Sequence, residues 1–258
     1  MNNINPVPAA VPPTIPSPGS TYPGLQNLGE NPEEREPIPN FVVVVEAILR
    51  QPRRVMYQLR QPGSGRLMAA MLFVAVVCSL VYGLVVGSFS MSNQLWAAPA
   101  KLALGMLISA LICLPSLYIF TCLSGSQARL AEMCGLLTGL LMLMTLLLVG
   151  FAPVAWLFSQ STDSVAWMGV LHLIFWFIAT FFGLRFLETG FSHTKARSSA
   201  GLNTWIIIFI LVVIQMTTAL RPIVGTAPTF LPKEKKFFIS HWGDNLSAPA
   251  KASRNSRD

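Results

Sequence analysis

The stretch that decides the fold is Gly135-Leu-Leu-Thr-Gly-Leu-Leu-Met-Leu-Met-Thr-Leu-Leu-Leu-Val-Gly150, the centre of a charge-free run over residues 134–157. A second charge-free run, residues 102–122, precedes it, and a short loop over residues 123–133 joins the two. A helix rises about 1.5 Å per residue, so roughly 20 apolar residues cross the hydrocarbon core of a bilayer. Both runs are long enough. Together they predict a transmembrane helical hairpin around which the rest of the chain packs.

Three further apolar runs, residues 67–88, 165–187 and 202–220, have the same character. Between residues 67 and 184 the chain has four charged side chains, which are Lys101, Arg129, Glu132 and Asp163. A soluble domain of this length needs far more surface charge to stay solvated. The fold class predicted is therefore all-α, a polytopic transmembrane helix bundle of about five spans over residues 67–222, in permanent contact with the lipid bilayer.

Small residues mark two ridges on the predicted spans. Ser79, Gly83 and Gly87 fall four apart in the first span, and Gly135 and Gly139 open the third. Such ridges let helices approach closely in a membrane. We expect them to serve packing within the chain, and association into a homo-oligomer is the alternative.

The two ends of the chain are polar. Residues 1–40 contain ten of the 19 prolines and an acidic group, and they read as a disordered Pro-rich tail that cannot bury enough apolar area to fold. Residues 223–258 read as a polar tail. The N-terminal side of the membrane has more Lys and Arg, which predicts a cytoplasmic N-terminus and an extracytoplasmic C-terminal tail. We expect the membrane to be the cell inner membrane if the protein is bacterial, and an endomembrane is the alternative.

Residues 41–66 form a different segment, predicted to be an amphipathic basic helix ahead of the membrane. Val45, Ile48 and Leu49 form an apolar stripe, and Pro52 breaks the helix into two halves. The candidate lipid or partner contacts on its polar side are Arg50, Arg53, Arg54 and Arg60. A helix of this pattern lies in a membrane interface, and each Arg near an anionic leaflet contributes about 1 kcal/mol. The alternative is that these arginines only fix the orientation.

No catalytic, cofactor or metal signature is present, so we expect a protein that is not an enzyme and needs no cofactor. The basic residues lack the polar, aromatic-lined face that nucleic-acid binding requires. The four cysteines, Cys78, Cys113, Cys122 and Cys134, lie in or beside spans and read as small apolar side chains. His172 and Gln215 lie within spans, and we expect each to form a hydrogen bond to a neighbouring helix.

The segment Ala47-Ile-Leu-Arg-Gln-Pro-Arg-Arg54, followed by five closely spaced spans and a Gly-containing loop between the second and third, resembles the Yip (Ypt-interacting protein) family and its bacterial relatives. The resemblance implies a membrane scaffold or adaptor that organises protein partners or lipids. The family's acidic-Leu-x-Gly-Pro element is missing before the first span, so no GTPase-binding residue carries over. The alternative is a small transporter, or the membrane subunit of one, with His172, Gln215 and Pro115 lining a path.

Overall fold

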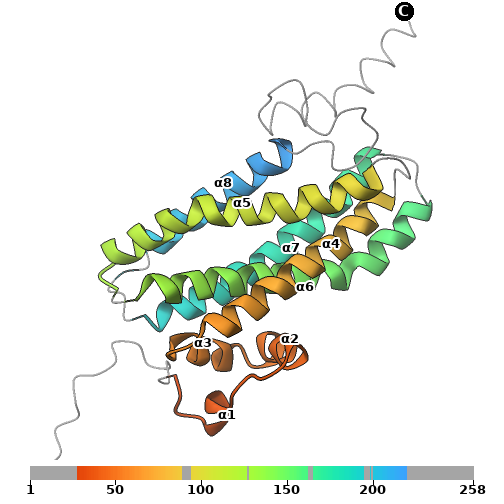
Figure 1. The fold of residues 1–258 in the computed structure, drawn as a ribbon. Coiled ribbons are helices and arrows are strands. Elements are labelled where there is room, and N and C mark those ends of the chain that lie inside the picture. Colours follow the sequence, from red (N-terminus) through yellow and green to blue (C-terminus); the bar gives the residue numbers. More distant parts are fainter. Residues whose placement is uncertain are drawn as a thin grey trace, which may run out of the picture.

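The computed structural model describes residues 28–88, 94–126, 128–161, 165–194, 198 and 200–219 (Figure 1). All regular structure among these residues is helical. The helices in chain order are α1 (Pro32–Arg35), α2 (Phe41–Arg50), α3 (Pro52–Arg60), α4 (Gly65–Ser88), α5 (Gln94–Leu123), α6 (Leu130–Ser161), α7 (Val165–Ser192) and α8 (Ala200–Ala219). The expected disorder of residues 1–27 and the expected polar tail at residues 223–258 lie outside the described part of the chain.

Four helices, α4, α5, α6 and α7, are long and apolar enough to cross a membrane. The 24 residues of α4 extend about 36 Å, against a hydrocarbon core of about 30 Å. Helix α8 is equally apolar and shorter. The predicted all-α membrane helix bundle of several spans is thus confirmed, with four long helices and one shorter one.

The bundle is arranged around α4, which packs against both α5 and α6 (Figure 1). Helix α7 packs on α6, and α8 packs on α5. The sequence pattern had suggested that the α5–α6 hairpin would occupy this central place. The small residues of α4 explain the difference, because a Cβ placed on Gly83 would come within 2.4 Å of the Pro99 backbone of α5. Only a glycine lets α4 and α5 come this close.

The small-residue ridges serve packing within the chain, as predicted. Ser79, Gly83 and Gly87 are buried in α4. In α6, a Cβ on Gly139 would lie 2.5 Å from the ring of Phe186 on α7. Each ridge therefore sets a helix crossing inside one molecule.

Two helices extend beyond their apolar runs. Helix α5 begins at Gln94, ahead of the run that starts at residue 102, and α6 continues to Ser161, past the run that ends at residue 157. Pro99 and Pro153 lie inside these helices. Neighbouring helices in a membrane can satisfy the carbonyl that a proline leaves without a partner, so a proline need not end a span.

Helices α1, α2 and α3 lie outside the bundle and cover one of its ends (Figure 1). We call residues 28–60 the cap. Helix α3 contacts α4, α6 and α7, and α2 contacts α4 and α6. Residues 28–40 were expected to belong to the disordered tail, and the structure corrects this, because they form α1 and a loop packed on α3.

Candidate interaction site: the charged cap

The predicted break within the pre-membrane segment is confirmed. Gln51 has φ −132° and ψ 57°, outside the helical region, and Pro52 is the first residue of α3. Proline lacks the N–H that would continue the hydrogen-bond ladder of α2, and its fixed φ suits the first turn of a helix. The segment therefore folds as two helices that can take different directions.

The apolar sides of these two helices face the bundle. The residues that are at most 3 % exposed are Val44, Ala47, Ile48, Val55, Met56 and Leu59. A Cβ on Gly135 of α6 would lie 2.7 Å from a methyl of Leu59, so this side chain fills the notch that the glycine leaves. The expectation that Ile48 faces lipid is therefore wrong, because protein covers it. Leu49 of the same predicted stripe remains 50 % exposed.

Glu34 of α1 holds Arg53 of α3. Its Oε1 lies 2.6 Å from the Nε of Arg53, and its other oxygen accepts the backbone N–H of Gly29. Burial of Glu34 favours the neutral acid, but the hydrogen bonds from Arg53 and Gly29 and the charge of Arg53 outweigh it. The pKa of Glu34 accordingly lies below its ordinary value. An acidic residue of the predicted tail thus neutralises one of the predicted contact arginines.

Gly29 is required where the chain turns into α1. Its φ is +89°, and a Cβ would lie 2.5 Å from the ring of Tyr57 on α3. A residue with a side chain would meet both backbone strain and this ring. The turn at Gly29 therefore lets residues 28–35 pack closely against α3.

Arg54 is fixed by the same segment. Its guanidinium donates to the carbonyl oxygens of Glu36 at 3.1 Å and Pro37 at 3.0 Å, and it lies 3.5 Å from the Glu36 carboxylate. Gln58, one turn further along α3, donates to the carbonyl oxygens of Arg35 and Glu36. The Arg54 side chain is 12 % exposed, so it serves mainly to hold the cap together.

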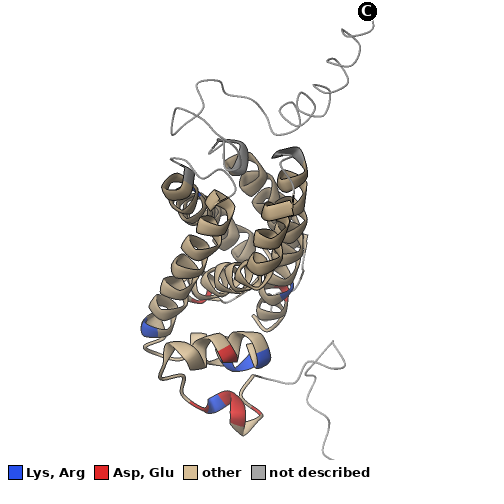
Figure 2. Ribbon diagram, turned by 90° about the vertical axis from the view of Figure 1, so that its right-hand side faces the viewer, with Lys and Arg blue, Asp and Glu red and all other residues tan. Residues whose placement is uncertain are grey.

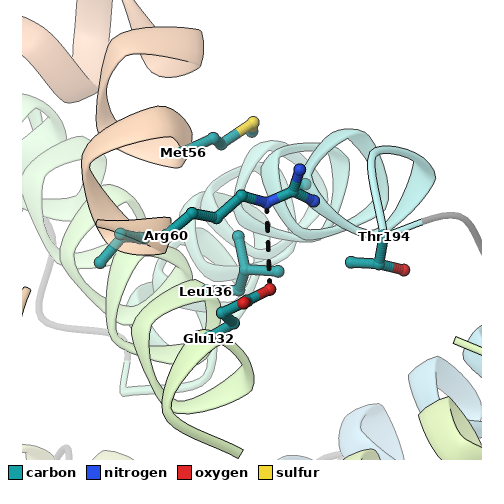
Figure 3. A pocket seen from close by; sticks show the side chains of 7 residues that line it. Met56, Arg60, Glu132, Leu136 and Thr194 are labelled. Atoms are coloured by element: carbon teal, nitrogen blue, oxygen red, sulfur yellow. Dashed lines mark ion pairs between the residues drawn. The ribbon is translucent and has the colours of Figure 1, made fainter. Parts of the chain in front are cut away.

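Arg60 connects the cap to the bundle. Its Nε lies 3.9 Å from a carboxylate oxygen of Glu132, in the first turn of α6 (Figure 3). The pair borders a small cavity between α3, α6 and α7, whose other lining residues are Met56, Leu59, Leu136, Gly190 and Thr194. Burial lowers the pKa of Arg60, and the charge of Glu132 opposes the shift, so the guanidinium stays charged. The ion pair fixes α3 to the start of α6.

Arg50 differs from the other three predicted contacts. Its side chain is 76 % exposed and pairs at 3.1 Å with Glu46, four residues earlier on α2, which is 58 % exposed. An exposed pair of this spacing contributes about 0.3–0.5 kcal/mol and leaves both groups accessible. Of the four arginines predicted to contact lipids or partners, Arg50 is the one most open to such a contact.

His193 belongs to this region and was missed in the sequence. It follows the last residue of α7 and lies within the influence of Arg53, Arg60 and Glu34. Its Nε2 is buried and has no hydrogen-bond partner among the described residues. Burial lowers the pKa of His193, the two arginines lower it further, and Glu34 opposes them. A single His after a span gives no sequence signal for this environment, which arises when the cap docks.

The charged residues of the described part of the chain gather at the cap end of the ribbon (Figure 2). The cap contains Arg35, Arg50, Arg53, Arg54 and Arg60, and Arg66 and Arg129 lie at the start of α4 and just before α6. Lys101 lies near the start of α5, toward the opposite end. This asymmetry is the pattern expected where a basic end faces the cytoplasm.

The polar residues considered for a transport path do not come together. His172 Nδ1 lies 2.8 Å from the hydroxyl of Tyr82 on α4, which confirms the expected bond between helices. Pro115 and Gln215 are exposed on α5 and α8, and the hydrogen bond expected of Gln215 stays a prediction. None of the three residues lines the cavity beside Arg60 and Glu132.

Comparison with known proteins gives no relative, since no family model, no curated protein and no solved structure matches the chain.

Proposed function

We propose that this integral membrane protein is a non-enzymatic scaffold or adaptor, as its resemblance to the Yip family implies, and that the cap is the part that organises partners. The observation that supports the proposal most is the way in which the cap is held. Buried or half-buried ion pairs connect Glu34 with Arg53 and Arg60 with Glu132. A segment fixed in this way presents a constant surface outside the membrane, which a partner can bind without ordering it first.

The chemistry of that surface is mixed. Glu33 and Arg35 of α1 are exposed and carry opposite charges. Charged rims of this kind set the orientation and the association rate of partners more than their affinity. The surface therefore suits a regulated, reversible contact.

The test is capture of partners by the full-length protein in mild detergent, followed by mass spectrometry. Arg53→Glu places two carboxylates together and should release the cap, so the captured partners should be lost. The double variant Glu34→Arg/Arg53→Glu restores opposite charges and should recover them. A partner set that does not change when the cap is released would contradict the adaptor proposal.

The transporter alternative is tested at His172. In an adaptor, His172→Asn keeps a hydrogen bond inside the bundle, which is worth on the order of 1 kcal/mol, and partner capture should be nearly unchanged. Loss of a cellular activity in a His172→Asn protein that still folds and captures its partners would favour transport.

A further inference from the structure

Helix α2 has three faces. At 100° per residue, its buried residues Val44, Ala47 and Ile48 fall on one arc, and the charged residues Glu46 and Arg50 fall on a second. A third arc of about 100° contains Phe41, Val42, Val45 and Leu49. On this third face, Val42 is 77 % exposed, Phe41 is 54 % exposed and Leu49 is 50 % exposed. An exposed apolar face next to a buried one requires a second apolar environment.

The third face is continuous with the lipid-facing surface of the bundle. The Phe41 ring lies 5.4 Å from the ring of Phe73 on α4, and Phe73 is itself 59 % exposed. Further along α4, Val77, Leu80 and Leu84 are also exposed. Because α4 is one of the membrane-spanning helices, its outward side chains contact lipid, and α2 extends that apolar surface.

The same contact gives α2 a depth in the membrane. Phe73 is eight residues from the first residue of α4, or about 12 Å along the helix. If α4, about 36 Å long, is centred on a core of about 30 Å, its end projects about 3 Å, so the backbone of Phe73 lies about 9 Å inside. Helical side chains lean toward the N-terminus, which brings the ring nearer the surface. Phe41 then lies in the outer part of the acyl region, where helices that lie in an interface bury their apolar face.

We propose that α2 is an interfacial helix, seated in the boundary between the acyl chains and the headgroups of the bilayer through Phe41, Val42 and Leu49. Helix α3 has no part in this contact, because the bundle covers its apolar side and carboxylates hold its arginines. The lipid contact predicted for the whole segment thus belongs to α2, through a face that includes Val45 and Leu49 of the expected stripe and excludes the buried Ile48. Arg50, on the neighbouring arc, can reach phospholipid phosphates.

This inference deepens the proposed adaptor function. It rests on that function in one respect, because it assigns α2 to lipid and leaves α1 and the outer side of α3 for protein partners. The lipid contact itself is measured without any partner. Its failure is therefore distinguishable from failure of the adaptor proposal.

The experiment uses full-length protein with Cys78, Cys113, Cys122 and Cys134 changed to Ala, in nanodiscs of phosphatidylcholine and phosphatidylglycerol. Spin labels are attached at Val42→Cys and Leu49→Cys, with Glu33→Cys on α1 as the exposed control. Oxygen partitions into lipid, whereas a nickel chelate stays in water. Labels at positions 42 and 49 should relax several-fold more with oxygen than with nickel, and the label at position 33 should show the reverse.

Two results would overturn the proposal. Strong relaxation by nickel at positions 42 and 49 would place this face in water, and weak relaxation by both agents would mean that protein covers it. If the cysteine-free protein does not fold, a benzophenone amino acid at position 42 of the native chain replaces the label. Cross-links to phospholipid are then expected, and cross-links to protein would reject the lipid contact.

Discussion

The four arginines of the cap show how strongly the neighbours of a residue decide its role. Arg53, Arg54 and Arg60 have carboxylates within 4.0 Å and side chains at most 31 % exposed, whereas Arg50 is exposed. A hydrogen bond to a charged group contributes about 1.5–3 kcal/mol, and the exposed Arg50–Glu46 pair contributes about 0.3–0.5 kcal/mol. Three of these side chains therefore stabilise the cap, and one is left for the membrane surface.

His193 should make docking of the cap depend on pH. Its pKa in the docked state lies below the ordinary 6.5, so the undocked state takes up a proton first as the pH falls. Docking should therefore weaken below about pH 6.5. Glu34 has a pKa below its ordinary 4.5, so its contribution is lost only near pH 4 and below. Protease sensitivity of residues 28–60, measured across this range, reports both steps.

The control for this prediction is His193→Gln, which cannot be protonated. It should remove the loss of docking that begins below about pH 6.5 and keep the more acidic step of Glu34. An unchanged pH profile in the variant would show that another group is responsible.

At the scale of elements, crossings between helices depend on places where one backbone meets another. A Cβ on Gly83 would press on the backbone of Pro99, which cannot rotate away as a side chain can. Overpacking of this kind costs about 1–3 kcal/mol, so Gly83→Ala should lower the thermal stability of the purified protein. The matched variant is Gly150→Ala in α6, where nothing lies within 4 Å.

Alanine favours a helix over glycine by up to about 1 kcal/mol, so Gly150→Ala should be neutral or slightly stabilising. Equal melting temperatures for the two variants would show that the backbones of α4 and α5 are farther apart at Gly83 and Pro99 than in the structure.

The sequence predicted the elements better than their ends. The apolar runs gave the spans and the proline gave the break at Gln51, because both signals are local. The starts of α5 and α6 were placed too late, because each helix begins before its charge-free run and includes a charged residue, Lys101 or Glu132. The burial of Glu34 could not be predicted, because it depends on Arg53, 19 residues away, docking beside α1. Ile48 was assigned to lipid for the same reason, because its burial depends on α2 docking on the bundle.

For the whole molecule, the charged cap end predicts an orientation. With the N-terminus in the cytoplasm and five crossings, a reporter active only outside the cytoplasm should give signal when fused after residue 230 and none when fused after residue 195. The reverse pattern would place the cap outside the cell and exclude a cytoplasmic adaptor role.

Hydrogen–deuterium exchange of the full-length protein in nanodiscs measures whether residues 28–60 form a cap docked on the membrane helix bundle. Amides of α3 should exchange slowly in the native protein. Glu34→Gln removes the charge that holds Arg53 and should speed exchange in α3 by about 10–150-fold, as expected for a loss of about 1.5–3 kcal/mol. The exposed neighbour Glu33→Gln should change nothing, and the spans should stay protected in both variants. Fast exchange of α3 in the native protein would contradict the account.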